Sequence, residues 1–200
     1  MPDGHSTSPS LTFVVDELLI PSFFPLLQRG VTIRCRLGIS ITVFLREKIG
    51  ATAGTINRIQ SVILDGMPVD DIEQAFIKDG STLALSAAMP GLVGATLRRG
   101  GTYSSFRSAI TYHEKGSPSL QGEGQVRVKL FNLLMSELGP GMLRKGVIVG
   151  GEEMVGLVTI QPREFWKGCR RITINNVPFD AMKLRDLSRE ERIFLVVTGG

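Results

Sequence analysis

The feature that most constrains the fold of this chain is an internal repeat at an offset of 110 positions. Without a gap, residues 62–70 (VILDGMPVD) lie over residues 172–180 (ITINNVPFD). Further matches in the same order join 83–85 to 193–195 and, with gaps, 26–31 to 142–147. Because similarity at a fixed offset is the signature of repeated supersecondary units, we expect two related units in these 200 residues.

Each half can be divided into two strands, a short helix and two more strands. Residues 31–37 alternate apolar and polar side chains, which is typical of a half-buried strand. Residues 41–49 change to helical spacing, with Ser40 as the cap and Gly50 as the left-handed stop. The remaining predicted strands are 11–19, 62–64 and 82–87 in the first half and 125–133, 146–150, 171–174 and 192–197 in the second, with a helix at 162–167.

This order of elements predicts an α+β fold class with two ubiquitin-like β-grasp units in tandem. In a β-grasp unit one helix lies across a mixed sheet, and the first and last strands pair in parallel. A stretch rich in glycine and serine separates the halves. The predicted division is a disordered tail at 1–10, a first domain at 11–115, a linker at 116–124 and a second domain at 125–200.

Composition excludes several classes of function. The net charge is +4, and no dense basic stripe indicates nucleic-acid binding. Cys35 and Cys169 are far apart, and with His5 and His113 they lack the close ligand pairs of a zinc site. A disulfide between the two cysteines stays possible, but ordinary thiols in a reducing compartment are the simpler interpretation. We expect no enzyme activity, cofactor or metal.

A membrane segment is not expected either. The uncharged run at 80–97 approaches the length of a membrane span, but Pro90, Gly91 and Gly94 interrupt it. We interpret it as a buried strand followed by an apolar loop from Ala88 to Leu97. The first residues lack the pattern of a signal peptide, so we expect a cytoplasmic protein.

The closing segments carry a recognisable pattern, with a short turn at residues 174–180 (INNVPFD) and a strand that closes with Gly-Gly at residues 193–200 (IFLVVTGG). These segments resemble the turn, the last strand and the terminal Gly-Gly of the MoaD/ThiS sulfur carriers, which are ubiquitin-like proteins. Residues 126–139 also resemble the family's first strand and following turn. The resemblance covers most of residues 126–200 and, more loosely, residues 30–90.

The resemblance implies a role for the C-terminus. In the family an ATP-dependent adenylating enzyme activates the terminal glycine carboxylate, which becomes a thiocarboxylate and passes sulfur to a synthase. Carried over, Gly200 is the reactive carboxyl and Gly199 its slender neighbour, since residues without Cβ can pass a narrow channel. The protein would be the substrate of these partners and not a catalyst.

Other interpretations stay open beside the carrier. A non-conjugated β-grasp interaction module would use the apolar loop Ala88–Leu97 as its contact surface. The segment Leu97–Gly101 (LRRGG) is either a processing site that exposes a new carrier end or a basic turn. Phe165 and Trp166 are interpreted as core residues of a helix face. The basic residues near that helix, which could bind an acidic partner or form a solvated face, are Arg163, Lys167, Arg170 and Arg171.

Overall fold

The computed structural model describes residues 8–88, 91–101, 111–112 and 122–200. It has a mixed α+β architecture and divides into two compact units. The boundaries of these units do not coincide with the two halves of the sequence repeat. Unit 1 joins residues 1–26 to residues 143–200, and unit 2 holds residues 27–142. None of the helices in the described ranges is long and apolar enough to span a membrane.

Unit 1 contains strands from both ends of the chain. Its strand order is β7-β10-β1-β8-β9, with β1 and β10 parallel and the other neighbours antiparallel. The strands are β1 (Ser10–Val15), β7 (Val147–Gly150), β8 (Cys169–Ile174), β9 (Val177–Pro178) and β10 (Arg192–Gly199). The helices are the 3₁₀ helices η1 (Glu17–Phe23) and η4 (Ala181–Asp186), with α6 (Gly151–Thr159) and α7 (Arg163–Lys167).

The core of unit 1 includes one face of β1, a strand along which buried and partly exposed residues alternate. Leu11, Phe13 and Val15 are buried, and the residues between them are partly exposed. Phe13 packs edge-on against Phe23, with ring centroids 5.1 Å apart. Phe23 in turn lies 5.8 Å from the ring of Phe165 on α7. The aromatic side chains therefore join the N-terminal strand to a helix of the second half.

Unit 2 is continuous in sequence and has the strand order β4-β3-β5-β6-β2. Here β5 and β6 are parallel, and the other neighbours are antiparallel. The strands are β2 (Val31–Arg36), β3 (Ser61–Leu64), β4 (Met67–Pro68), β5 (Thr82–Ser86) and β6 (Glu123–Phe131). The helices are α2 (Ile41–Phe44), its π-helical continuation η2 (Leu45–Ile49), α3 (Ala53–Arg58) and α4 (Gly91–Leu97).

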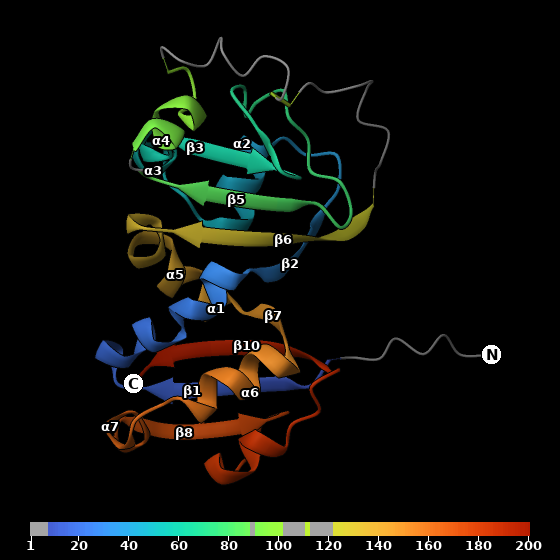
Figure 1. Ribbon diagram of the computed structural model, residues 1–200. Coiled ribbons are helices and arrows are strands. Elements are labelled where there is room, and N and C mark those ends of the chain that lie inside the picture. The colour runs from blue at the N-terminus through green and yellow to red at the C-terminus, as the bar shows by residue number, and fades with distance from the viewer. Residues whose placement is uncertain (1–7, 89–90, 102–110, 113–121) are drawn as a thin grey trace, which may run out of the picture. The chain divides into compact units, whose positions relative to one another are not determined.

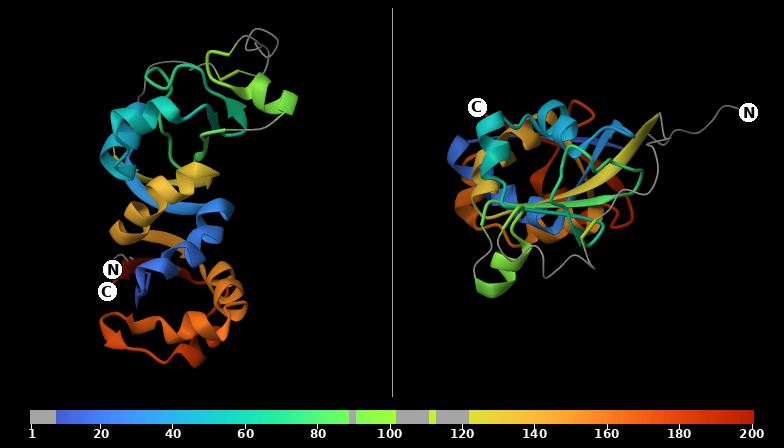
Figure 2. Two further views of the ribbon diagram at one scale, coloured as in Figure 1. Left: turned by 90° about the vertical axis from the view of Figure 1, so that its left-hand side faces the viewer. Right: turned by 90° about the horizontal axis from the view of Figure 1, so that it is seen from above.

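Local sequence explains where the unit 2 helices begin and end. The Ser40 hydroxyl accepts a hydrogen bond from the Val43 N–H, and Gly50 ends the helix in the left-handed conformation (φ 85°), so the predicted helix at 41–49 is confirmed. Both views of Figure 2 show α2 and α3 on one side of the unit 2 sheet and α4 on the other. The region predicted as an apolar loop, Ala88–Leu97, therefore holds a helix over Gly91–Leu97.

The two units have exchanged the strands that open the repeats. In Figure 1 the blue β1 lies between β10 and β8 of the second half, and the yellow β6 lies between β5 and β2 of the first half. The predicted domains 11–115 and 125–200 therefore differ from the compact units at these strands. The physical reason is that β1 and β6 share the same alternation, which fixes the buried face of a strand but not its neighbour.

The remaining predicted segments lie partly beyond the described ranges. Residues 1–7 of the predicted tail at 1–10 are outside the description, whereas Ser10 already belongs to β1. Residues 116–121 of the predicted linker are likewise outside it, whereas Glu123 and Gly124 belong to β6. Two further elements, α1 (Phe24–Arg29) and α5 (Leu133–Lys145), carry the chain across the divisions between the units.

Candidate functional site

The C-terminal glycines lie within the sheet of unit 1. Gly199 is the last residue of β10 and is in register with Val15 of β1. The Gly200 N–H donates a hydrogen bond to the Val15 carbonyl over 3.1 Å. A Cβ atom on Gly199 would lie 2.6 Å from Glu17 Cγ, and one on Gly200 would lie 2.5 Å from Val14 Cγ1. Close packing against β1 and η1 therefore explains structurally why both positions are glycine.

A groove of about 400 Å³ crosses the sheet of unit 2 on the face opposite α2. The alternation of three strands produces it, because Val62, Leu85 and Leu130 point into the core and their neighbours point away. In the ladder, Ile63 is opposite Ala84, and Ala84 is opposite Lys129. The groove is lined by Ser61, Ile63, Ala84, Leu85, Ser86, Lys129, Phe131 and Asn132.

Polar groups stand at one end of this groove. The Ser86 hydroxyl donates to the Ala88 carbonyl (3.0 Å) and accepts from the Asn132 side-chain amide (3.1 Å). Ser61 is only 2% exposed, and its hydroxyl has no hydrogen-bond partner within the described part of the chain. A buried hydroxyl without a partner is destabilising by about 1–3 kcal/mol. The groove thus combines apolar walls with one unsatisfied polar group.

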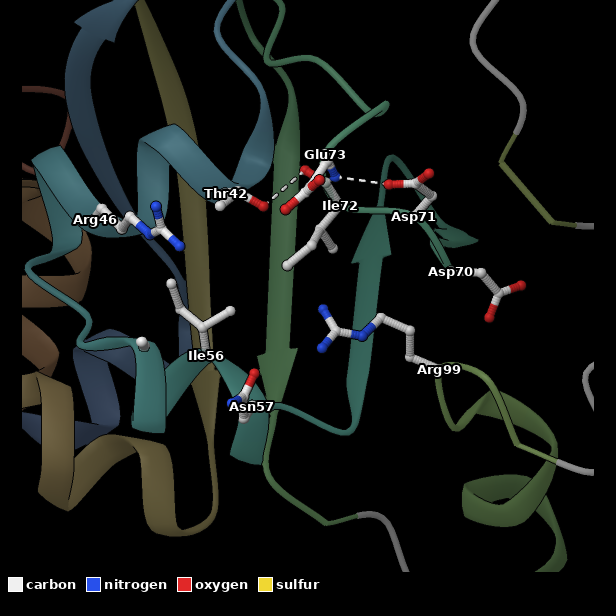
Figure 3. A pocket seen from close by; sticks show the side chains of 10 residues that line it. Thr42, Arg46, Ile56, Asn57, Asp70, Asp71, Ile72, Glu73 and Arg99 are labelled. Carbon is white, nitrogen blue, oxygen red and sulfur yellow. Dashed lines mark hydrogen bonds between the residues drawn. The ribbon is translucent and has the colours of Figure 1, made fainter.

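A second pocket, of about 490 Å³, opens between α2, α3 and the loop that follows β4. Figure 3 shows two guanidinium groups directed into it, that of Arg46 from η2 and that of Arg99 from the segment after α4. Ile56 and Ile72, 6% and 7% exposed, form its apolar floor. Its other lining residues are Thr42, Ala53, Asn57, Asp70, Asp71 and Glu73.

Hydrogen bonds between side chains and the main chain hold the loop that forms one wall of this second pocket. The Thr42 hydroxyl donates to the Ile72 carbonyl over 3.3 Å. The Asp71 carboxylate accepts from the N–H groups of Glu73 and Gln74, over 2.9 and 3.1 Å. The Asp70 carboxylate accepts from the Gly100 N–H over 3.1 Å. Both aspartates therefore already serve as acceptors within the protein.

The cysteines show no sign of reactivity. Both are free thiols, and burial raises the pKa of Cys35 and of Cys169 above the usual range. A thiol with a raised pKa is a poor nucleophile at neutral pH. Among the described residues no group of His, Cys, Asp and Glu could hold a metal ion.

The other side chains singled out in the sequence have structural partners. Phe165 is 2% exposed, and its ring packs edge-on against Trp166 at 5.0 Å. Arg170 forms a salt bridge with Asp16 at 2.7 Å, so part of the basic cluster is used inside unit 1.

The sequence marks Leu97–Gly101 as a basic segment but gives no sign of the pocket that Arg99 lines. The pair Arg98-Arg99 is a signal of charge alone, and only the folded chain places Arg99 against residues more than 25 positions away. The Ser61 groove was missed as well, because a serine inside a strand is no functional signal in a sequence.

Comparisons with protein-family models, with curated proteins and with solved structures give no match for this chain. The resemblance to MoaD/ThiS carriers therefore stays a prediction.

Proposed function

We propose that this protein is a tandem β-grasp interaction module and that unit 2 binds a segment of a partner protein in the groove between β3, β5 and β6. Two features support the β-grasp interpretation. Each unit has a central parallel pair of strands flanked by antiparallel ones, and a helix follows the strand at one end of that order.

The observation that carries the binding role is the groove on the face of the unit 2 sheet that lies opposite α2. Ile63, Ala84 and Phe131 line this apolar groove, and the buried Ser61 hydroxyl has no partner there among the described residues. Apolar surface that stays open on a folded unit marks interaction sites. Leu92 on α4 is a second apolar side chain of unit 2 with high exposure, 74%.

The groove indicates the chemistry of the partner segment. An aliphatic or aromatic side chain fits against Ile63 and Phe131, and a main-chain carbonyl of the partner accepts a hydrogen bond from the Ser61 hydroxyl. The Lys129 ammonium group favours an acidic residue next to the inserted side chain. The partner is thus a peptide segment that carries an apolar residue beside a carboxylate.

Selection from a random short-peptide display library tests this function. We expect the selected peptides to combine apolar and acidic residues and to shift the amide NMR signals of Ile63 and Ala84. Ala84→Gln fills the groove and should weaken binding by roughly tenfold or more, about 1.4 kcal/mol. Thr82→Gln, on the same face of the same strand but outside the groove, is the matched control and should bind normally.

Two results would count against the interaction module: a selection that yields no binding peptide, and selected peptides that bind Ala84→Gln as tightly as the unmodified protein.

Activation of the C-terminal Gly-Gly, as in a sulfur carrier, is the second proposal, and the terminal sequence is its support. The Gly200 N–H is bonded to the Val15 carbonyl, so drawing the whole Gly-Gly segment out of the sheet would break this hydrogen bond. Intact-mass analysis of protein isolated from its host tests the idea. A mass increase equal to one oxygen-to-sulfur exchange supports it, and an unmodified terminus without labelling by any host adenylating enzyme refutes it.

A further inference from the structure

The second pocket contains an arginine group that lacks an acceptor. Arg99 Nη1 is buried and has no hydrogen-bond partner among the residues that the structure describes. Because leaving a buried donor of a charged group unsatisfied is costly, a ligand that supplies an acceptor oxygen gains that free energy on binding. Carboxylates match the fork of a guanidinium group in a bidentate geometry, as phosphates do.

The main chain holds Arg99 over the pocket from both sides. Its own N–H donates to the Gln60 carbonyl over 2.7 Å, just before β3. The next N–H, of Gly100, donates to the Asp70 carboxylate over 3.1 Å. Gly100 has a positive φ of 62°, which turns the chain after Arg99. These hydrogen bonds therefore fix the main chain at Arg99 beside the pocket before any ligand arrives.

The charges of the pocket indicate more than a simple anion. Arg46 adds a second guanidinium group on the opposite side (Figure 3). Asp70 and Asp71 are bound by main-chain amides, whereas the Glu73 carboxylate accepts no hydrogen bond from the described residues. Since positive and negative groups surround one cavity, a ligand with both a carboxylate and an ammonium group matches it better than an anion does.

The floor of the pocket is apolar. Ile56 and Ile72 lie between the two guanidinium groups in Figure 3. The volume of about 490 Å³ falls within the range of about 300–1,000 Å³ typical of small-molecule sites. An aliphatic side chain has room to contact both isoleucines while the polar end of the ligand faces the charged rim.

We propose that this pocket binds an aliphatic α-amino acid. The ligand carboxylate accepts hydrogen bonds from Arg99 and faces Arg46, the ammonium group faces Glu73, and the aliphatic side chain packs on Ile56 and Ile72. This site uses none of the residues that line the groove of unit 2. A failure of the interaction-module proposal therefore leaves this proposal unaffected, and the reverse also holds.

Methyl NMR of the full chain with three related probes tests the proposal. L-leucine carries all three groups, isocaproate lacks the ammonium group, and isoamylamine lacks the carboxylate. We expect saturable shifts of the Ile56 and Ile72 methyl signals with L-leucine, weaker binding of isocaproate and no binding of isoamylamine.

Variants assign the two charged contacts. Arg99→Met should weaken L-leucine binding by roughly tenfold or more, and Arg98→Met, the adjacent and exposed arginine, is the matched control that should bind normally. Glu73→Gln should weaken L-leucine and leave isocaproate unchanged. The methyl signals of Leu130, a core residue outside the pocket, report whether each variant stays folded.

Three results would overturn the assignment. They are the absence of methyl shifts with L-leucine, unchanged affinity in a folded Arg99→Met variant, and equal binding of isoamylamine and L-leucine.

Discussion

The substitution Phe13→Ala tests the exchange of strands between the two sequence halves. Phe13 belongs to the first half of the chain, yet its ring is fully buried in unit 1 and packs on Phe23. The aromatic contacts continue through Phe165 to Trp166. Because Trp166 is the only tryptophan of the chain, its fluorescence reports the unit to which Phe13 belongs.

The expected loss of stability follows from the burial of the ring. A phenylalanine side chain buries about 150–250 Å², which at about 25 cal/mol per Å² corresponds to about 4–6 kcal/mol for complete burial. Alanine keeps part of that area, and measured Phe→Ala changes in cores cost about 3–5 kcal/mol. We therefore expect the free energy of unfolding of unit 1 to fall by about 3–5 kcal/mol.

Denaturant unfolding followed by Trp166 fluorescence is the assay. Phe13→Ala should move the midpoint of the fluorescence transition to lower denaturant concentration. Phe44→Ala removes an equally buried ring from unit 2. It is the control for the general effect of truncating a core side chain outside unit 1. An unchanged Trp166 midpoint in Phe13→Ala would refute the placement of β1 in unit 1. Residues 125–200 alone lack β1, so we also expect this fragment to give a collapsed amide NMR spectrum.

Three further predictions concern single sites. Gly151→Ala should destabilise the protein by about 1–3 kcal/mol in denaturant unfolding, because the new Cβ would lie 1.9 Å from the Ser188 carbonyl oxygen. Gly141→Ala has open space on α5 and should stabilise by about 0.5–1 kcal/mol, and a loss there would contradict the reasoning. The hydrogen bonds from Thr55 and Arg58 hold the pKa of Glu137 below its usual range, so this group stabilises the fold above its unfolded pKa and loses that effect as pH falls through the folded value. NMR titration of the Glu137 carboxyl should show the low pKa, and Thr55→Val should raise it; identical titration curves would show that the hydroxyl contributes nothing.

The candidate sites were only partly predictable from the sequence. The pair Gly199-Gly200 is visible in the printed chain, but its pairing with Val15 is a product of the sheet. The segment that contains Arg99 was recognised as basic, but its pocket needs Ile56 and Ile72 from two other parts of unit 2. Residues that share a pocket without sharing a local pattern leave no signal in a single sequence.

The sequence by itself determined the local elements. Ser40 and Gly50 set the limits of a helix, and Asp65-Gly66 makes a tight turn in which both residues have positive φ. These features depend on the residues themselves and their immediate neighbours, so a reader of the chain can find them.

Only the tertiary structure decided which strands became neighbours. β1 pairs with β10 and β6 pairs with β5, although the repeat alone would join β1 to β5 and β6 to β10. The main-chain hydrogen bonds of a parallel pair are the same for any side chains, and both opening strands bury every second residue. Alternation therefore fixed the buried face of each strand, while the choice of partner was left to the packing of whole units, as in the contact of Phe13 with Phe23.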